Sequence, residues 1–347
     1  MDQITTMYNV SNITWDEVRF MEEVRPGIFR STYQLQNFSW SKRLERYAVV
    51  EPGKKALLID AGWDKLCGTH LFDYITQDMG VPWDQVMIFI SHFHPDHFGS
   101  LRYCLDQGAT CVMHEDFKPL TNKVAARFNQ LVANPDEPLT SLMREEDMAT
   151  EAFDAVKDMK TLAEVSIAGY RFRPLLTPGH TKGHLCLVED TQKFIFAGDH
   201  IVAGNPLMES FDIDEHIIQN YLDTFPRLEA MGFKTIYMSH LDPIEGEEAV
   251  QAQLEASRQY LRRPLTKALN ILKQGPTTVW DLTDAYYANR GEHLMDLGVL
   301  RRSLRLSARL AFLEYLYDAG AATRQLREDG ALLYTAVDEF DPTSLIP

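Results

Sequence analysis

The feature that most constrains this chain is a short histidine-rich segment, SHFHPDH, that directly follows the apolar run QVMIFI. Pro95 removes a backbone donor and restricts the residue before it, so we predict a loop leaving a strand rather than a regular helix. In an extended loop, His92 and His94 can point one way while Asp96 and His97 turn towards a second point. Three imidazoles and a carboxylate this close together suit zinc, and they can also suit iron or manganese.

Three further segments, far apart in the sequence, each supply one more metal-binding side chain. TPGH brings His180, AGD brings Asp199 and MSH brings His240, and each segment follows or ends a predicted strand. The carboxyl ends of strands are where open sheets place their binding sites. Alternatively, these side chains only satisfy hydrogen bonds in polar loops. That alternative explains each segment alone, but not why all three follow or end a predicted strand. The predicted metal ligands are therefore His92, His94, Asp96, His97, His180, Asp199 and His240.

Alternating strand and helix patterns predict an α/β fold for most of the chain. The β-rich start has a turn signal at Pro52 and Gly53, and the stretch at about 115–165 carries no clear strand. We interpret this stretch as helices inserted between strands, and a long insertion beside a site often forms a lid or a substrate wall. Strands are expected near 24–34, 45–50, 54–62, 85–90, 110–114, 165–176, 184–190, 193–199 and 233–240, and helices near 69–80 and 97–107.

The last part of the chain has a different pattern, in which three predicted helices are followed by a hairpin. A helical pattern runs to Arg263, Pro264 marks a boundary, and Asp329 with Gly330 forms a hairpin turn signal. The helices are expected at 265–274, about 279–288 and about 294–318. This order is typical of a winged helix. We therefore predict a catalytic domain at 1–263, with a helical insertion at about 115–165, and a winged-helix-like C-terminal domain at 264–347.

The charge of the chain argues against nucleic acid and anionic membranes as partners. There are 50 acidic and 34 basic residues, which give a formal net charge of −16. Such a charge opposes binding to phosphate backbones and acidic lipid surfaces. No apolar run approaches the roughly 20 residues of a membrane-spanning helix, and the acidic N-terminus lacks the pattern of a secretory signal. We therefore expect a cytoplasmic protein without a membrane partner.

The four cysteines, Cys67, Cys104, Cys111 and Cys186, show no paired spacing of the kind found in metal or redox motifs. A free cysteine is among the most commonly buried side chains. We expect all four to be small core residues in a reducing compartment.

The order of the motifs resembles the signature of the metallo-β-lactamase superfamily. LLIDAG, SHFHPDH, TPGHTKGH, FAGD and a strand ending in His240 follow one another over about residues 20–245. The resemblance implies an αββα sandwich in which Asp60 supports the ligand loop without binding metal. His184 and His200 are expected to have supporting or packing roles. The resemblance also implies that His92, His94 and His180 hold one metal, that Asp96, His97 and His240 hold the other, and that Asp199 bridges them.

Two departures narrow the position of the chain within that superfamily. His94 stands where the diiron flavoproteins of this fold carry glutamate, and Asp199 stands where the true β-lactamases use other residues. The chain is therefore most similar to the members of the superfamily that include glyoxalase II, lactonases, thioesterases and nucleases. The resemblance implies a hydrolase with two divalent metal ions, zinc being expected and iron or manganese being alternatives.

A water that bridges two divalent ions loses a proton near neutral pH, and the resulting hydroxide is the expected nucleophile. Asp96 is the candidate catalytic residue, because it is both a ligand and a neighbour of that water. Its expected role is to orient the water and to carry a proton to the leaving group.

The C-terminal segment 264–347, which we call the tail, bears on the choice of substrate. A winged-helix-like tail after such a domain resembles the β-lactamase-like endoribonucleases and a broad group of related bacterial hydrolases. Arg301, Arg305 and Arg309 recur every four residues on the longest predicted helix, with Arg302 beside them. They either hold phosphates of RNA, coenzyme A or a phosphopantetheine arm, or they form a solvated helix face.

Because the catalytic segment is acidic, we rank hydrolysis of a small acyl ester or thioester first, lactone opening second, and cleavage of RNA or another phosphodiester third. A catalytically silent binding or regulatory protein is a further alternative, against which the complete ligand set argues. The expected partner is a small acyl substrate, with or without a coenzyme A or phosphopantetheine carrier. The tail and the insertion are expected to wall its pocket, although the tail can equally serve as the contact of a homodimer.

Overall fold

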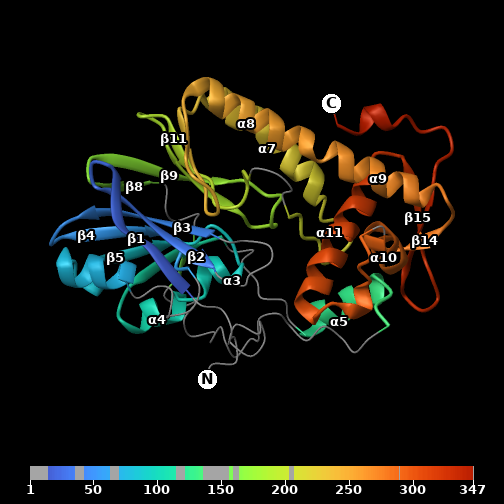
Figure 1. Cartoon of the computed structure of the whole chain (residues 1–347), viewed down its shortest axis with the longest axis horizontal. Helices are drawn as coiled ribbons and strands as arrows, with labels where there is room; N and C mark the ends of the chain where they lie inside the picture. The colour runs from blue at the N-terminus through green and yellow to red at the C-terminus, as the bar shows by residue number, and fades with distance from the viewer. Residues whose placement is uncertain are drawn as a thin grey trace.

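Two β-sheets lie face to face in one half of the molecule, on the left in Figure 1. The computed structural model describes residues 15–35, 43–62, 70–114, 122–135, 156–158, 164–202, 207–288 and 290–346. The first sheet keeps the order of the chain: β1 (Trp15–Arg25), β2 (Ile28–Leu35), β3 (Arg43–Glu51), β4 (Lys55–Ile59), β5 (Val86–Phe89), β6 (Thr110–Met113) and β7 (Val156–Asp158). Strands β1 to β4 form an antiparallel meander, and β4 to β7 run parallel. The predicted β-rich start is thereby confirmed.

The second sheet has the spatial order β13 (Ile244–Glu245), β12 (Thr235–Tyr237), β11 (Phe194–Phe196), β10 (Leu185–Glu189), β9 (Tyr170–Leu176) and β8 (Val165–Ile167). Its neighbouring strands are antiparallel except for β11 and β12, which run parallel. All the strands that the sequence predicts between 165 and 240 lie in this sheet.

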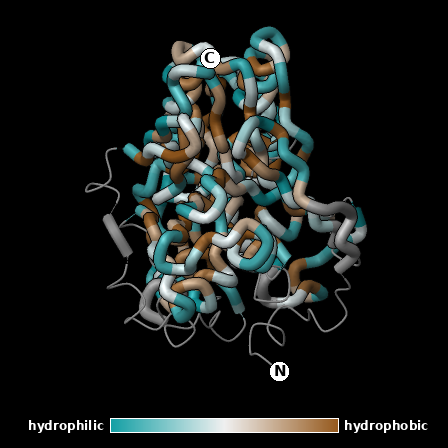
Figure 2. The backbone as a smooth tube through the Cα atoms, turned by 90° about the vertical axis from the view of Figure 1, so that its left-hand side faces the viewer, coloured by the Kyte–Doolittle hydropathy of each residue, from teal (hydrophilic) through white to brown (hydrophobic). Residues whose placement is uncertain are grey.

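Strand β3 shows why the first sheet is apolar on both faces. Tyr47 and Val49 pack between the two sheets, where they meet side chains of the second sheet such as Phe172. Ala48 and Val50 point the other way, into a core beneath the helices. Successive side chains of a strand alternate between faces, so a continuous apolar run marks a strand that is covered on both sides. Figure 2 shows the hydrophobic segments gathered in the interior.

Helices cover the outer faces of both sheets (Figure 1). On the first sheet lie a helical segment that ends in the π-helical turn η2 (Tyr74–Asp78), the short 3-10 turn η3 (Trp83–Gln85) and helix α4 (Leu101–Asp106). Helices α7 (Ile217–Met231) and α8 (Glu247–Tyr260) cover the second sheet. The predicted αββα sandwich of an α/β fold is confirmed.

The histidine-rich segment contains a helical turn that the sequence analysis excluded. We predicted a loop through Pro95, but helix α3 (Pro95–Phe98) begins at this proline. Proline is tolerated at the first helical position, because the backbone N–H that it lacks would have no intrahelical partner there. The two histidines before α3 lie in the loop, and Asp96 and His97 lie on the helix.

The prediction that residues 115–165 carry no clear strand is wrong at Val156–Asp158, which form β7. Strand β7 pairs parallel with β6 and forms the edge of the first sheet. Its three residues, VKD, are too few to show a hydrophobic period, so the pattern gave no signal. Helix α5 (Asn122–Leu131) is the helix described in this stretch, and much of the predicted helical insertion lies outside the described residues.

The tail has helices and a hairpin where the sequence predicts them. In chain order it contains α9 (Arg262–Leu272), β14 (Thr277–Thr278), α10 (Val279–Ala288), η5 (Leu294–Asp296), α11 (Val299–Asp318), β15 (Ala322–Leu326), β16 (Leu332–Ala336) and η6 (Pro342–Leu345). Its three strands form a small sheet with β16 in the middle. The winged-helix classification and the domain boundary after 263 stay predictions. None of the described helices is long and apolar enough to cross a membrane.

The tail shares one hydrophobic core with the helices of the second sheet. Leu228 of α7, Leu254 of α8, and Leu310 and Leu316 of α11 belong to a single buried cluster, which Phe128 of α5 joins. Removing the tail would expose this core to water, at a cost of about 25 cal/mol for each Å² of apolar surface. The role of the tail must therefore be tested by point substitutions in the whole chain.

The three cysteines that the structure describes, Cys104, Cys111 and Cys186, are free and buried. Burial raises the pKa of the Cys104 and Cys186 thiols to about 12, so both stay protonated at neutral pH. The predicted core role is confirmed for these three. Cys67 lies outside the described residues.

Candidate metal centre

Asp60 follows β4 in a left-handed backbone conformation, with φ 64°, and anchors the loop after β5. Its Oδ1 accepts a hydrogen bond from the backbone N of Ser91 at 2.7 Å, and its Oδ2 accepts one from Ser91 Oγ at 2.8 Å. The same Oδ2 lies 2.7 Å from Nδ1 of His97. Asp60 therefore fixes the start of the ligand loop and the ring of His97, which is the supporting position that the family resemblance implies.

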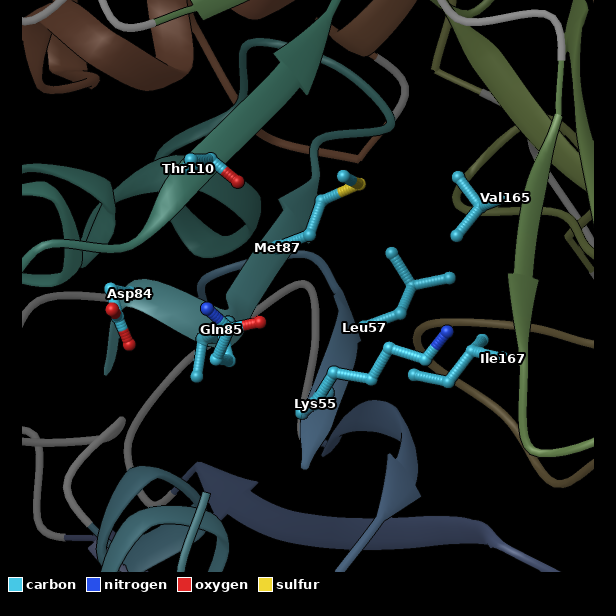
Figure 3. Close-up of a pocket in the computed structure, with 10 residues that line it drawn as sticks. Lys55, Leu57, Asp84, Gln85, Met87, Thr110, Val165 and Ile167 are labelled. Atoms are coloured by element: carbon cyan, nitrogen blue, oxygen red, sulfur yellow. The ribbon is translucent and has the colours of Figure 1, made fainter. Parts of the chain in front are cut away.

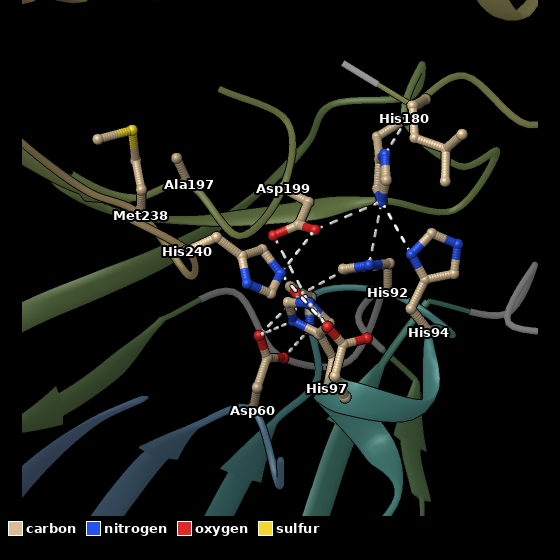
Figure 4. Close-up of polar contacts among 12 residues, drawn as sticks. Asp60, His92, His94, His97, His180, Ala197, Asp199, Met238 and His240 are labelled. Atoms are coloured by element: carbon tan, nitrogen blue, oxygen red, sulfur yellow. Dashed lines mark hydrogen bonds and ion pairs between the residues drawn. The ribbon is translucent and has the colours of Figure 1, made fainter. Parts of the chain in front are cut away.

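Three histidines from two loops converge on one point (Figure 4). Nε2 of His180 lies 3.1 Å from Nε2 of His92 and 3.0 Å from Nδ1 of His94. His92 and His94 follow β5, and His180 follows β9. Together with Asp199, which follows β11, these side chains offer four donor atoms within 4.8 Å of one another. We call them the first group.

Asp96, His97 and His240 form a second group of donors, again within 4.8 Å of one another. Nε2 of His240 lies 3.3 Å from Asp96 Oδ2. Asp199 stands between the two groups: its Oδ2 is 3.1 Å from Nε2 of His240 and 3.9 Å from Nε2 of His180. Its Oδ1 is 3.5 Å from Nε2 of His97. The structure thus brings all seven predicted ligands together, at the carboxyl ends of four strands.

Buried polar atoms in both groups fit divalent cations. Nε2 of His97 and Oδ1 of Asp199 are buried with no hydrogen-bond partner among the described residues. The three imidazole nitrogens of the first group that point at one another cannot all satisfy each other as donor and acceptor. Imidazole and carboxylate donors converging in this way match the ligand types of zinc and related metals. The side chains present therefore fit a pair of such ions.

Burial keeps two imidazoles of the first group neutral. Desolvation by burial, with the neighbouring His97, lowers the pKa of His92 well below its usual value. Burial likewise lowers the pKa of His180 to about 4. Burial also opposes a charge on His94, but the carboxylate of Glu209 outweighs it and raises the pKa of that ring. A neutral imidazole is the form that binds a metal.

Carboxylates reverse the effect of burial in the second group. Burial lowers the pKa of His97, but Asp199, Asp96 and Asp60 outweigh it and raise that pKa to about 10. The pKa of His240 is likewise raised well above its usual value by Asp199 and Asp96 against the effect of burial. In turn, His97 and His240 overcome burial and lower the pKa of Asp96 to about 2. The second group is therefore a set of ion pairs in which a cation would replace protons.

Backbone carbonyls hold the outer side of two rings. Nδ1 of His180 donates to the carbonyl of Leu207 at 2.6 Å, and Nδ1 of His240 donates to the carbonyl of Arg43 at 2.8 Å. Because Nδ1 of each ring is used in these hydrogen bonds, Nε2 is the ring atom left to bind a cation at the centre of the cluster.

Glu209 is a buried side chain that touches the first group and was not predicted from the sequence. Its Oε2 lies 3.0 Å from Nε2 of His94, and its Oε1 is buried with no hydrogen-bond partner among the described residues. Residue spacing carries no signal for this contact, because the two side chains meet only in the folded chain. A glutamate directly after the apolar residues of PLM is the only hint in the sequence.

His184 and His200 lie outside both groups. Nδ1 of His184 faces Thr177 Oγ1 at 3.0 Å, and its Nε2 accepts a hydrogen bond from the backbone N of Asp199 at 3.3 Å. Nε2 of His200 lies 2.6 Å from Oγ1 of Thr224 on α7. His184 therefore helps to place Asp199, and His200 joins its loop to α7.

Aromatic rings border the first group. The ring of Phe93 lies 5.3 Å from the ring of His94 and 6.5 Å from that of Phe211, which lies 5.3 Å from Phe128 of α5. Phe93 and Phe211 are half-buried, and Phe128 belongs to the core that the tail shares. The described part of the insertion and the tail therefore meet behind an apolar wall beside His94.

The arginines of α11 lie on the side of the helix away from this wall. Arg309 is buried, with its Cζ 4.2 Å from a tyrosine ring of α10, and Cζ of Arg305 lies 3.9 Å from the next tyrosine ring. On the opposite side of α11, Glu314 accepts a hydrogen bond from the backbone N of Asp214. The solvated-face interpretation is wrong for Arg309, while Arg301 is exposed.

A separate pocket of about 220 Å³ opens at the other end of the first sheet (Figure 3). Lys55 and Met87 of the first sheet and Val165 and Ile167 of β8 line it, and Lys55 Nζ donates to the carbonyl of Ser166 at 2.7 Å. No histidine lies among its described lining residues. Because the metal-binding side chains sit at the carboxyl ends of the strands, this pocket is not part of the metal centre.

Comparisons with known proteins agree with the fold. The sequence profile of the family described as "Metallo-beta-lactamase superfamily" matches residues 46–240. A Caenorhabditis elegans protein named "Beta-lactamase-like protein 2 homolog" is 22% identical over 207 residues, 58% of this chain and 57% of that protein. An Aspergillus fumigatus protein named "Atrochrysone carboxyl ACP thioesterase" is 26% identical over 113 residues, 32% of this chain and 34% of that protein. The chain thus matches about half or less of the length of these curated relatives.

Two solved structures share the fold over nine tenths of the chain. A metallo-beta-lactamase family protein from Thermus thermophilus has a TM-score of 0.69 at 21% identity, covering 90% of this chain and 100% of that one. A beta-lactamase domain protein from Burkholderia ambifaria has a TM-score of 0.68 at 20% identity, covering 91% and 94%. Since the family profile spans more than half of the sequence and the αββα sandwich gathers the predicted donors at its strand ends, this chain belongs to the metallo-β-lactamase superfamily of metal-dependent hydrolases.

Proposed function

We propose that the seven clustered side chains hold two divalent metal ions and that the chain hydrolyses acyl thioesters or esters. The first group binds one ion, the second group binds the other, and Asp199 bridges them. The observation that carries this proposal is the position of Asp199, whose carboxylate oxygens lie 3.1–3.9 Å from histidines of both groups. Zinc is the expected metal because the donor set is rich in imidazole, with iron and manganese as alternatives.

When bound, two such ions lower the pKa of a water towards neutrality and stabilise negative charge on the substrate oxygen. The chain itself supplies orientation. Asp96 is ionised, since His97 and His240 lower its pKa to about 2. An ionised carboxylate accepts hydrogen bonds, and one of low pKa holds a proton only briefly. The main role of Asp96 is therefore to orient the attacking water, and its second role is to pass the proton on to the leaving group.

The apolar wall beside the first group supports an acyl substrate. Phe93 and Phe211 are half-buried rings next to His94, and an acyl chain packed on them gains from leaving water. The net charge of −16 disfavours RNA in the same place. Support for a thioester comes from the partial relatives in Aspergillus fumigatus and Aspergillus aculeatus, both named as atrochrysone carboxyl ACP thioesterases. We therefore place acyl groups carried on coenzyme A or phosphopantetheine first.

Elemental analysis of the purified chain tests the two-metal site. We expect about two ions per chain, and a chain that holds one ion or none after gentle purification would contradict the assignment. His92→Ala and Asp199→Ala should each lose metal and activity together. Lys234→Ala, at an exposed position just before β12 and so at the end of the strand away from His240, is the control that should keep both.

A hydrolysis screen of the metal-loaded chain tests the substrate class. Acyl-CoA, the same acyl group on pantetheine, an acylglutathione, a lactone, a phosphodiester and short RNA are compared at equal concentration. Faster turnover of either thioester than of RNA is expected. The pair of acyl-CoA and acyl-pantetheine isolates the contribution of the phosphates. Preferential, steeply salt-dependent RNA cleavage would refute the acyl assignment.

A further inference from the structure

A short segment between β11 and α7 touches two ligands of the first group. Within residues 207–210, the carbonyl of Leu207 accepts from His180 Nδ1 at 2.6 Å, and the backbone N of Glu209 donates to the carbonyl of His180 at 3.2 Å. The side chain of Glu209 places Oε2 3.0 Å from Nε2 of His94. We call residues 207–210 the strap, because it joins ligands that come from two different loops.

His94 differs from the other rings of the first group in the nitrogen that it presents. Its Nδ1 faces His180 at the centre of the group, so its Nε2 points outwards into the buried shell. Glu209 occupies that position and is itself buried, with 3% of its surface exposed. A buried carboxylate beside a neutral imidazole is unfavourable, because the neutral ring gives too little attraction to offset the loss of water around the charge. If Nδ1 held a cation, the ring would be polarised and Nε2–H would become a stronger donor to the carboxylate, which would offset that cost.

We propose that the strap sets the metal affinity of the first group, with Glu209 as the positioning residue for His94. The proposal rests on the two-metal site proposed above. Apart from the shared Asp199, Glu209 is the carboxylate that contacts the described ligands of the first group. It supplies negative charge next to three imidazoles and fixes one of their rings. Asp60 has the corresponding place in the second group, where its Oδ2 contacts Nδ1 of His97.

The strap is held in place by the tail. The backbone N of Ser210 donates to the carbonyl of Ser307 on α11 at 3.4 Å. Farther along, the backbone N of Asp214 donates to Glu314, which also accepts from Tyr334 of the tail hairpin. The first group is therefore linked to the tail through the strap, whereas the second group is built from the sandwich alone, on α3 and the loop after β12. A defect in the strap should consequently affect the two ions unequally.

Zinc titration of the whole metal-free chain against a chromophoric chelator tests the proposal, with the absorption spectrum of the cobalt-loaded chain as a second readout. In Glu209→Leu the affinity of one of the two ions should fall by about 10–100-fold, as is common when a support of a ligand is lost. The other ion should keep its wild-type affinity. Glu209→Gln, which keeps an acceptor but not the charge, should show a smaller loss and remains informative if the leucine variant does not fold.

Glu189→Gln is the matched control. Glu189 is buried like Glu209, at the end of β10, where it accepts a hydrogen bond from the backbone N of Gln192, and no contact with the strap or the metal-binding side chains is described for it. This variant should bind both ions as the wild type does. If Glu209→Leu bound both ions with wild-type affinity, or lost affinity equally for both, the role of the strap would be overturned while the two-metal site would stand. A wild-type chain that binds fewer than two ions would overturn the two-metal site itself, and the strap with it.

Discussion

Asp60→Ala is expected to weaken both the fold and the second group. The carboxylate accepts hydrogen bonds from the backbone N and the Oγ of Ser91 and contacts Nδ1 of His97, all at 2.7–2.8 Å. Each buried donor left without a partner costs about 1–3 kcal/mol, and entry of water keeps the cost near the lower end, so three donors cost about 3 kcal/mol. Alanine at φ 64° adds about 1 kcal/mol. The free energy of unfolding should fall by about 4 kcal/mol, a large share of the roughly 5–15 kcal/mol that is typical of a domain.

Asp60→Asn separates the cost of the lost hydrogen bonds from the cost of the left-handed backbone. Asparagine tolerates the left-handed backbone and keeps an acceptor for the N–H of Ser91, so the expected loss is about half, roughly 2 kcal/mol. Urea unfolding of the metal-free chain measures both values. Chelator competition should show the affinity of the second group reduced by about 10–100-fold in the alanine variant, with the first group much less affected. An alanine variant as stable as the wild type, or no more damaged than the asparagine variant, would refute the reasoning.

Two further substitutions test the packing around the site. In Gly179→Ala the new Cβ would lie 2.5 Å from Cβ and 2.7 Å from Cα of Tyr221 on α7, at φ 149°, so the melting temperature and zinc binding by the neighbouring His180 should both fall. His216 pairs with Asp318 at 2.7 Å, and this contact raises its pKa. The stabilisation is thus complete below the unfolded pKa of about 6.5 and disappears as pH rises through the folded pKa. His216→Gln should therefore lower the free energy of urea unfolding by no more than about 1 kcal/mol in acid and leave it unchanged in alkali, and the opposite pH order would contradict the assignment.

The positions of the seven donors were predictable because each is set by a local rule. His180, Asp199 and His240 each follow a short strand, and strands covered on both faces are visible as continuous apolar runs. Since the carboxyl ends of neighbouring strands share one edge of a sheet, side chains just beyond them must come together. The alternation of inward and outward residues on β3 follows from the same local geometry.

Features that depend on tertiary contact were not predictable. Pro95 predicted a loop in place of a regular helix, although proline is excluded from the interior of a helix and not from its first turn, where α3 has it. Strand β7 is held in the sheet by hydrogen bonds to β6, and its own residues show no strand pattern. Glu209 reaches His94 only because the strap folds against His180 in the tertiary structure. No spacing in the sequence encodes a meeting of that kind.

The arginines of α11 show what the period of a helix can predict from a sequence and what it cannot. A spacing of four residues correctly places Arg305 and Arg309 on one side of a helix, but it does not say which element that side faces. In the folded chain they stack on the tyrosine rings of α10, while Glu314, on the opposite side of the helix, faces the segment that leads to the strap. Neither stacking contact places these guanidinium groups on the side of α11 that carries Glu314. We therefore expect any effect of the tail on the metal centre to pass through the side of α11 on which Glu314 accepts a hydrogen bond from the backbone N of Asp214.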